Sequence, residues 1–420
     1  MGRWSGVPPP PGETVRPDGP AGPASAAAPD DRRRSPNRNA REQGRPRPMK
    51  LTIERSTLLK ALAHVQSVVE RRNTIPILSN VLLDAQKSRL LLTATDMDIA
   101  IVESVEADVA RSGAVTVPAH TLYDIVRKLS EGSQVGIEAI ADKGQVALRA
   151  GRSSFALASL PPGDFPHMAG SDLPHQFELA SAELKGLIDK TRFAISTEET
   201  RYYLNGIYLH AGQSSGIGVL RAVATDGHRL ARVEMALPAG ADGIPGVILP
   251  RKTVIELHKL ITETDATVQV SLSESRVRFT IGEMTLTSKL IDGTFPDYER
   301  VIPAGNDKVM EVDRVEFTAA VDRVATISTD KSRAVKLSLG KNQLTLTASS
   351  PDAGNAEEEI TVRYAGPPIE IGFNARYLLD IAEQIEGEGA RFRMADAAAP
   401  TLVEDIADQS ALYVLMPMRV

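Results

Sequence analysis

The sequence of 420 residues contains no cysteine. This absence excludes disulfide bonds, thiolate metal sites and cysteine nucleophiles, and it fits the reducing cytoplasm, where we expect the protein to reside. The chain also lacks any apolar run near the ~18 to 20 residues of a membrane span, so no membrane contact is expected. Hydrophobic residues make up 42% of the chain, which is ordinary for a globular protein of about two to four domains.

Signatures of catalysis are equally scarce. The seven histidines follow no ligand spacing, and there is neither a phosphate-binding loop of the GxxxxGK type nor a GxGxxG turn after a strand. We therefore predict no metal site, no cofactor and no catalytic residue. One alternative stays open, because Asp226 and His228 are candidates for half of a catalytic pair. No nucleophile is paired with them by motif, and an Asp-Gly turn after a strand, with or without a binding role, also explains the stretch.

What the chain does contain is a repeat. Residues 117–129, 249–261 and 373–385 share one amphipathic pattern, and the copies start 132 and 124 residues apart. Apolar residues coincide at three positions, which hold Leu122, Val254 and Leu378, then Ile125, Leu257 and Ile381, then Leu129, Ile261 and Ile385. This spacing predicts the same helix in three similar domains.

Each copy opens with a second helical pattern, at residues 53–62, 179–188 and 312–321. Ser56, Ser181 and Asp313 lie near the starts of these helices as candidate N-caps. Runs of period two between and after the helices predict strands. The fold class is therefore α+β, with three tandem domains that each carry two helices on antiparallel sheets. The predicted domains span residues 49–174, 175–303 and 304–420.

The first 48 residues differ in composition from the rest. They hold 11 prolines, nine arginines and five acidic residues, a composition that cannot bury a core. We predict that residues 1–48 are a disordered Pro/Arg-rich extension, dispensable or mis-assigned, with Met49 as the natural start, or alternatively a nucleic-acid-binding tail. Removing nine of the 48 basic and five of the 54 acidic residues takes the net charge from −6 to −10. Nucleic acid is then repelled unless basic residues gather on one face.

The predicted helices carry many of the basic residues. These are Lys60, Arg127, Lys128, Lys185, Lys190, Arg192, Arg251, Lys252, Lys259, Arg314, Arg323 and Arg376. A cationic or titratable residue recurs in the first helical turn, at His120, Lys252 and Arg376, where a cation opposes the helix dipole at a cost of ~0.3 to 1 kcal/mol. Such a placement in all three units indicates use, although any exposed helix face also carries lysines.

Two further clusters and the C-terminus allow more than one interpretation. Arg201, Tyr202 and Tyr203 combine a guanidinium with two rings, which suits contacts to phosphates and bases, or they begin a half-buried strand. The loop with Arg72 either reaches phosphate or stays solvated. Residues 413–420 are apolar to the end, which predicts a last strand, one wall of an adaptable groove, or both.

Residues 49–420 resemble one protein family across all three predicted domains. The matching motifs are residues 75–78 (IPIL), 201–206 (RYYLNG), 223–230 (VATDGHRL), 288–293 (SKLIDG), 295–298 (FPDY) and 416–419 (MPMR). Together they identify the chain as similar to the bacterial DNA polymerase III β subunits, the sliding clamps. The resemblance implies a non-catalytic processivity factor, a head-to-tail homodimer whose six domains form a ring around duplex DNA, with helices inside and sheets outside.

The resemblance also implies site residues. Arg72, Tyr202 and Tyr203 are implied to contact DNA without reading its sequence, and His120 stands where the family has an arginine. The charge pattern adds further candidate DNA contacts, at Arg127, Arg201, Arg251, Lys252 and Arg376. The dimer contact is implied to join Phe155 and Leu157 of one chain to Thr326 and Ile327 of the other; Thr326 is more polar than its family counterpart.

A peptide groove between the second and third domains is implied as well. Its residues are Leu204, Thr225, Gly227, His228, Arg229, Leu230, Pro296, Arg300, Val301, Asn374, Tyr377, Pro400, Val414, Met416, Pro417, Met418 and Arg419. The implied partners are the DNA polymerase III α subunit, the clamp loader, other polymerases and repair proteins, through short apolar motifs. We expect the turn 225–230 and the apolar C-terminus to have no equals in the other domains. A repeat scaffold that binds proteins but not DNA stays open as an alternative.

Overall fold

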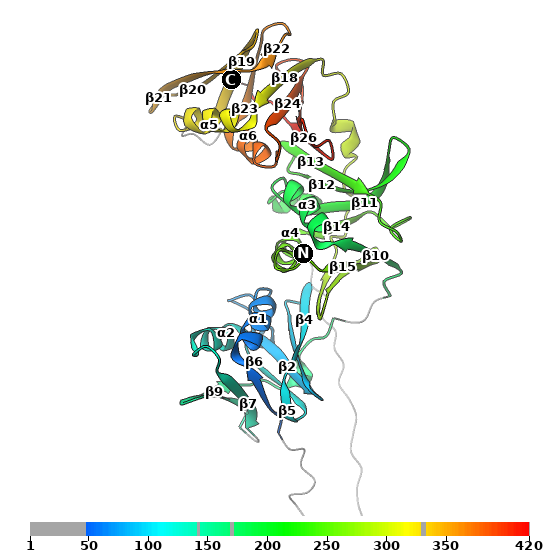
Figure 1. Ribbon diagram of the computed structural model, residues 1–420, viewed down its shortest axis with the longest axis vertical. Helices are drawn as coiled ribbons and strands as arrows, with labels where there is room; N and C mark the ends of the chain where they lie inside the picture. Colours follow the sequence, from blue (N-terminus) through cyan, green and yellow to red (C-terminus); the bar gives the residue numbers. More distant parts are fainter. Residues whose placement is uncertain (1–47, 141–142, 169–171, 329–332, 420) are drawn as a thin grey trace, which may run out of the picture. The chain divides into compact units, whose positions relative to one another are not determined.

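The computed structural model describes residues 48–140, 143–168, 172–328 and 333–419. The predicted disorder of the Pro/Arg-rich extension therefore concerns residues that lie, apart from Pro48, outside the described part. Within the described part, six α-helices and 26 strands follow one another in three units of similar element order (Figure 1). None of these helices is long and apolar enough to cross a membrane.

The elements repeat from unit to unit. The first unit holds β1 (Lys50–Glu54), α1 (Arg55–Gln66), η2 (Pro76–Ser79), β2 (Asn80–Gln86), β3 (Arg89–Thr95), β4 (Ile99–Glu106), β5 (Asp108–Arg111), β6 (Gly113–Pro118), α2 (Ala119–Lys128), β7 (Gln134–Ile140), β8 (Gln145–Ala150), β9 (Ser153–Ala158) and η3 (Pro162–Asp164). The second holds β10 (His175–Ala180), α3 (Ser181–Arg192), η4 (Glu199–Leu204), β11 (Gly206–Ser214), β12 (Ile217–Thr225), β13 (Arg229–Ala236), β14 (Val247–Pro250), α4 (Arg251–Thr262), β15 (Thr267–Leu272), β16 (Arg276–Ile281) and β17 (Met284–Lys289).

The third unit follows the short 3-10 helix η5 (Tyr298–Val301). It holds β18 (Lys308–Asp313), α5 (Arg314–Ala325), β19 (Ala334–Gly340), β20 (Gln343–Ser350), β21 (Gly354–Thr361), β22 (Arg363–Tyr364), β23 (Ile369–Asn374), α6 (Ala375–Ala382), β24 (Gly389–Met394), β25 (Thr401–Asp405) and β26 (Ala411–Leu415). The predicted α+β repeat of two helices and antiparallel strands is thus confirmed. The domain boundaries at residues 174 and 303 stay predictions, and both positions lie between elements.

The two helices of each unit lie side by side, α1 with α2, α3 with α4, and α5 with α6 (Figure 1). Their predicted apolar faces point into the core, since Leu122, Val254 and Leu378 are at most 2% exposed. In α2 the prediction for Ile125 is only partly right. That side chain is half-buried, and its neighbour Val126 is the one fully buried against the sheet.

Only one of the three predicted N-caps is confirmed. The Asp313 carboxylate accepts a hydrogen bond from a backbone N–H of the first turn of α5 at 2.8 Å. Ser56 and Ser181 do not cap their helices. Glu54 caps α1 instead, because its longer side chain already reaches the first turn, and the Ser181 hydroxyl donates to the Thr264 carbonyl at 2.8 Å.

The sheets do not stop at the joints between units. An eight-stranded sheet runs β10-β15-β16-β17-β4-β3-β2-β6, and a nine-stranded sheet runs β14-β11-β12-β13-β26-β25-β24-β18-β22. Two pairings, β17 with β4 and β13 with β26, join neighbouring units, and every pairing in these sheets is antiparallel. Two smaller sheets, β5-β1-β7-β8-β9 and β21-β20-β19-β23, belong to the first and third units alone.

Candidate functional site

A hollow of about 400 Å³ lies where the second unit meets the third. It is lined by Arg201, Tyr203, Leu204, Thr225, Gly227, Arg229, Leu230, Pro296, Tyr298, Val301, Val414 and Met416. The segments that supply these residues are far apart in sequence. The pairing of β13 with β26 brings them together, since it sets Leu230 directly opposite Val414.

The floor of the hollow is apolar and buried. Leu204, Leu230 and Val414 are at most 4% exposed, and they belong to one buried cluster that also holds Phe295 and Tyr298. In contrast, Val301 at the rim is 44% exposed. An apolar floor beneath an accessible rim is the arrangement of a site that receives apolar side chains from a partner.

The turn between β12 and β13 forms one wall and is held by its own side chains. The Thr225 hydroxyl donates to the Arg229 carbonyl at 2.7 Å, and one Asp226 oxygen accepts from the backbone N–H groups of His228 and Arg229 at 2.9 and 3.0 Å. Gly227 has a φ of +88°, and a Cβ there would lie 2.5 Å from the guanidinium of Arg201. A side chain at position 227 would therefore be strained, and the Arg201 side chain would have to move to make room for it.

This geometry removes the support for a catalytic pair. The Asp226 carboxylate is occupied by backbone N–H groups and by the Arg229 guanidinium, whose Nε lies 3.2 Å from Oδ2. The His228 ring stacks on Tyr377, with centroids 6.1 Å apart. No hydrogen bond joins the two side chains in the described structure, so Asp226 builds a turn and does not orient a base.

Arg229 ties the turn to the third unit. It is 8% exposed, and its guanidinium pairs with Asp380 of α6 and donates to the Phe193 carbonyl at 2.7 Å. The same group lies 4.5 Å from the centroid of the Tyr377 ring and 5.0 Å from that of Phe193. One side chain thus joins the groove wall, the end of α3 and the start of α6.

The remaining predicted groove residues do not line this hollow. Pro417, Met418 and Arg419 line an adjacent hollow beside β23, where the Met418 N–H donates to the Gly372 carbonyl at 2.7 Å. The Arg300 side chain is 85% exposed and pairs with Asp297. The other predicted residues, His228, Asn374, Tyr377 and Pro400, do not line the main hollow.

Three lining residues were absent from the predicted groove. Arg201 and Tyr203 were assigned to DNA contact, yet both line the hollow, and Tyr298 was not assigned at all. Tyr298 closes the motif 295–298, so its place beside Pro296 is a signal that the sequence offers. Arg201 could not be found in this way, because its approach to Gly227 depends on the fold.

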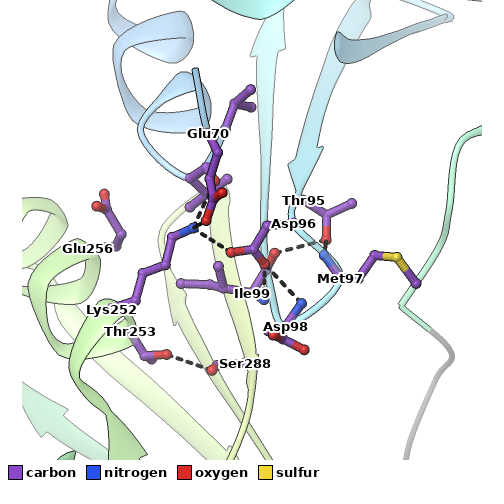
Figure 2. Close-up of polar contacts among 12 residues, drawn as sticks. Glu70, Thr95, Asp96, Met97, Asp98, Ile99, Lys252, Thr253, Glu256 and Ser288 are labelled. Atoms are coloured by element: carbon purple, nitrogen blue, oxygen red, sulfur yellow. Dashed lines mark hydrogen bonds and ion pairs between the residues drawn. The ribbon is translucent and has the colours of Figure 1, made fainter. Parts of the chain in front are cut away.

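Several predicted DNA contacts converge on the segment after α1. Lys252, in the first turn of α4, pairs with Asp96 and lies 3.4 Å from a Glu70 oxygen, and Figure 2 shows its ammonium group between the two carboxylates. The His120 ring, in the first turn of α2, lies 2.9 Å from the Val69 carbonyl. Arg72 follows this segment and is exposed.

Lys252 is thus committed to a contact between the first and second units. Burial disfavours its charge, but the hydrogen bond and attraction to Asp96 outweigh burial and raise the pKa of Lys252. Its ammonium group is partly neutralised, which leaves less charge for a phosphate. His120 is likewise engaged by the protein, since its Nε2 lies 2.9 Å from the Val69 carbonyl.

The other predicted DNA contacts remain accessible. Tyr202 is 53% exposed on η4, and Arg251 is exposed at the start of α4, next to η4 through the hydrogen bond from its N–H to the Asn205 carbonyl. The Arg376 side chain is 68% exposed, 3.8 Å from Asp380. Arg127 is 56% exposed and lies 3.2 Å from Asp124.

The residues predicted for a dimer contact lie at sheet and helix ends. Phe155 and Leu157 belong to β9, which ends its sheet with β8 as its one partner strand in the described structure. Thr326 and Ile327 directly follow the last residue of α5, and Thr326 is exposed. In the same way, β21 ends the third unit's small sheet.

A buried histidine joins the first and second units. His64 of α1 lies 2.7 Å from Glu103 of β4 and 3.0 Å from Glu263 at the end of α4. Burial alone would lower the pKa of His64, but the hydrogen bonds to Glu103 and Glu263 outweigh burial and raise it. A raised pKa means that the folded state binds the proton more tightly than the unfolded state.

This raised pKa predicts a pH-dependent stability. The contribution of protonated His64 is complete below its unfolded pKa of about 6.5 and is lost as pH rises through the higher folded pKa. We expect the thermal midpoint of the protein to exceed that of His64→Gln at about pH 6, and the gap to shrink by pH 8.5. Exposed His167→Gln is the matched control, and a gap that stays constant with pH would contradict the assignment.

The joint between the second and third units carries a comparable ion pair. Lys190 of α3 lies 2.7 Å from Asp408 in the turn before β26. Burial would raise the pKa of Asp408, but the bonds from Lys190 and Ser410 outweigh it and lower the pKa to about 2. The pKa of Lys190 is raised for the same reason. Both shifts favour the charged pair, so it holds the joint at neutral pH.

A tandem repeat of two-helix units, sheets shared across the joints and an apolar hollow at one joint define the class of DNA-clamp proteins. In the described residues no group of three or more His, Asp or Glu side chains is placed to hold a metal ion.

Comparison with known proteins agrees with the class that the fold defines. Three family models of the DNA polymerase III β subunit match this chain. The model of the N-terminal domain matches residues 49–169, that of the central domain residues 178–297, and that of the C-terminal domain residues 299–419.

Individual relatives are similar over nearly the whole chain. The β sliding clamp of Caulobacter vibrioides is 56% identical over 372 residues, which covers 89% of this chain and all of that protein. A crystal structure of the C. crescentus clamp with polyethylene glycol bound has a TM-score of 0.88 at 56% identity. That of a Bartonella birtlesii clamp bound to griselimycin has a TM-score of 0.86 at 51% identity, and both cover 89% of this chain and 100% of the solved chain.

The chain therefore belongs to the family of DNA polymerase III β subunits, the β sliding clamps. Its function is that of a processivity clamp in DNA replication and not that of an enzyme. The catalytic alternative is thereby rejected on two independent grounds, the geometry around Asp226 and the family.

Proposed function

We propose that two copies of this chain close head to tail into a ring around duplex DNA, and that the hollow between the second and third units binds short apolar motifs of replication proteins. The partners are the DNA polymerase III α subunit, the clamp loader, other polymerases and repair proteins, and the compartment is the cytoplasm. The observation that carries the proposal is the buried apolar floor of Leu204, Leu230 and Val414 beneath an accessible rim.

Ligands of two relatives support the groove. The C. crescentus clamp holds polyethylene glycol in a proposed β-motif tethering region, and the B. birtlesii clamp binds griselimycin. In this chain the hollow offers eight apolar or aromatic side chains at its rim and floor, together with the guanidinium of Arg201. A motif with one or two large apolar side chains and a nearby acidic group fits that lining.

The free sheet edges support the ring. A strand at the end of a sheet presents unpaired N–H and C=O groups, and the described structure has such ends at β9 in the first unit and β21 in the third. Phe155 and Leu157 of one chain would then meet Thr326 and Ile327 of the other. Three near-equal units per chain suit a head-to-tail contact that closes after two copies.

The charge distribution supports sliding. A protein with a net charge of −6 binds DNA only where basic residues are gathered. The accessible members of the predicted contact surface are Arg72, Arg127, Tyr202, Arg251 and Arg376. Contacts of this kind go to phosphates and read no bases, so they allow movement along the duplex. Retention then comes from the closed ring and not from affinity.

Retention on nicked circular DNA tests the ring. Clamps loaded by their clamp loader should co-elute with the circle in gel filtration and should be lost once a restriction enzyme linearises it. The variant Arg72→Glu with Arg376→Glu should load roughly 3- to 10-fold less efficiently, because charge reversal repels phosphate. Lys252 is left unchanged, since its reversal would place a third acid beside Asp96 and Glu70.

The matched control is Arg363→Glu, whose side chain is 89% exposed on β22. It should load like the unmodified protein. Retention that ignores linearisation would remove the ring from the proposal, and full loading of the double variant would favour a protein-binding scaffold over a DNA clamp.

A further inference from the structure

A second hollow, of about 440 Å³, lies where the first unit meets the second. It occupies the same place in the repeat as the groove between the second and third units. Its lining includes Thr95 and Ala100 of the first unit and Arg276, Arg278 and Thr287 of the second. Nothing in the clamp function described above uses this site.

The turn that frames this hollow has the geometry of the groove turn. The Thr95 hydroxyl donates to the Ile99 carbonyl at 2.9 Å, and one Asp96 oxygen accepts from the N–H groups of Asp98 and Ile99 at 2.9 and 2.8 Å. Met97 takes a φ of +79°, close to the +88° at the corresponding glycine of the groove turn. The expectation that turn 225–230 has no equal is therefore wrong, because side-chain bonds hold both turns in one shape.

The strands that end beside the two turns, β17 and β26, are also equivalent. The Lys289 N–H donates to the Asp98 carbonyl at 2.8 Å, and the Met416 N–H donates to the His228 carbonyl at 2.9 Å. Both contacts sit where β17 or β26 leaves its sheet, directly beside the turn. The two joints therefore share one backbone frame.

The side chains on that frame differ in chemistry. At the first joint the row across the sheet is Ala100, Thr287 and Arg278, whereas at the second it is Leu230, Val414 and Leu402. Three apolar side chains are thus replaced by one small, one hydroxyl-bearing and one cationic side chain. The short Ala100 and Thr287 leave the hollow open, and no Asp or Glu is among its described lining residues.

The charge of Arg278 is available to a ligand. In the described part of the chain, no ion pair or side-chain hydrogen bond engages Arg278. Arg276 lies two residues earlier on the same face of β16 and adds a second positive charge. The acid of the framing turn, Asp96, points to Lys252 on the far side of the turn, as Figure 2 shows.

We propose that this hollow is a second docking site, for an extended acidic segment of a protein partner. The Arg278 guanidinium is the anchor for one carboxylate, and the positive charge of Arg276, whose attachment point lies roughly 6.5 Å away on the same face of the strand, favours a second acid further along an extended peptide. A guanidinium binds a carboxylate through two parallel hydrogen bonds, and Thr287 adds a hydroxyl donor. The hollow is as large as the apolar groove and exceeds the needs of one small anion.

Fluorescence anisotropy tests the site with two labelled ten-residue probes, alternating Asp-Ser and alternating Asn-Ser. The full-length protein should bind the acidic probe at least tenfold more tightly than the neutral one at physiological salt. Arg278→Glu should weaken the acidic probe at least tenfold, and Arg278→Gln about threefold to tenfold, the factor that one net hydrogen bond of about 1 kcal/mol gives. Lys341→Glu, an equal charge change in an exposed turn outside the hollow, should leave binding unchanged.

Several results would overturn the proposal. Equal binding of the two probes, or an equal loss in Lys341→Glu, would mean that net charge alone attracts the acidic probe. Loss of binding in Met416→Ala would place the probe in the apolar groove, and displacement by equimolar inorganic phosphate at constant ionic strength would mean a small-anion site. Should Arg278→Glu fail to fold, Arg278→Gln and the isosteric Thr287→Val give the answer. Each must weaken binding of the acidic probe and leave binding of the neutral probe unchanged.

Discussion

Replacing Arg229 by alanine is expected to destabilise the protein by about 3 to 5 kcal/mol, the usual cost of removing one partner from a buried ion pair. The change would leave Asp226 and Asp380 without their common cation, and it would remove a guanidinium that lies against both Phe193 and Tyr377. Urea unfolding followed by circular dichroism should show the loss as an earlier transition of the second and third units.

Two further variants sharpen the result for Arg229. Arg229→Lys should restore little, because an ammonium group can neither form the forked set of bonds nor stack on the rings. Arg363→Ala, which removes an 89% exposed guanidinium, should leave the transition where it is. An Arg229→Ala protein as stable as the unmodified one would show that the contacts at this joint contribute nothing net.

Val301→Glu is expected to weaken an apolar clamp-binding peptide by at least about 2 kcal/mol, or roughly 30-fold. Val301 lines the groove and is 44% exposed, so the free protein can hold a carboxylate there in water. A bound apolar peptide would strip that water away, and the carboxylate would lose its hydration without gaining a partner. Anisotropy with a labelled peptide from the polymerase α subunit measures the effect.

The matched control for the groove is Val315→Glu on α5. Val315 is 60% exposed and belongs to neither hollow, so peptide binding should stay within twofold of the unmodified protein. Thermal midpoints of both variants should agree with that of the parent. If Val301→Glu bound the peptide as well as its control did, the hollow would not be the partner site.

The repeat and its helices were predictable because they depend on local order. Apolar residues that recur with a period of 3.6, as around Leu122, Val254 and Leu378, lie on one face of a helix. That face is buried whichever segments pack against it. The family resemblance was likewise carried by short motifs. Residues such as Thr225, Leu230 and Met416, which line the observed hollow, could be placed from those motifs.

Contacts between residues distant in sequence were not predictable in the same way. Lys252 looked like a free cation of a helix start, yet the fold brings it to Asp96, which precedes it by 156 residues. The continuous sheets were also missed, because a strand's pattern of apolar residues does not show whether its partner strand belongs to the same unit. The place of Arg201 in the groove was not predictable either, because its contact with Gly227 joins residues that only the fold brings together.

The linear order of residues was enough to specify three helix-and-strand units, a non-catalytic composition and the family, because each depends on periodicity or on short motifs. The fold alone settled which cations stay available and which hold the joints together, because ion pairs such as Lys252–Asp96 and Arg229–Asp380 form between segments that only the packing of neighbouring units brings close. It also gave the two equivalent joints their different linings, apolar at Leu230 and cationic at Arg278, on one shared backbone frame.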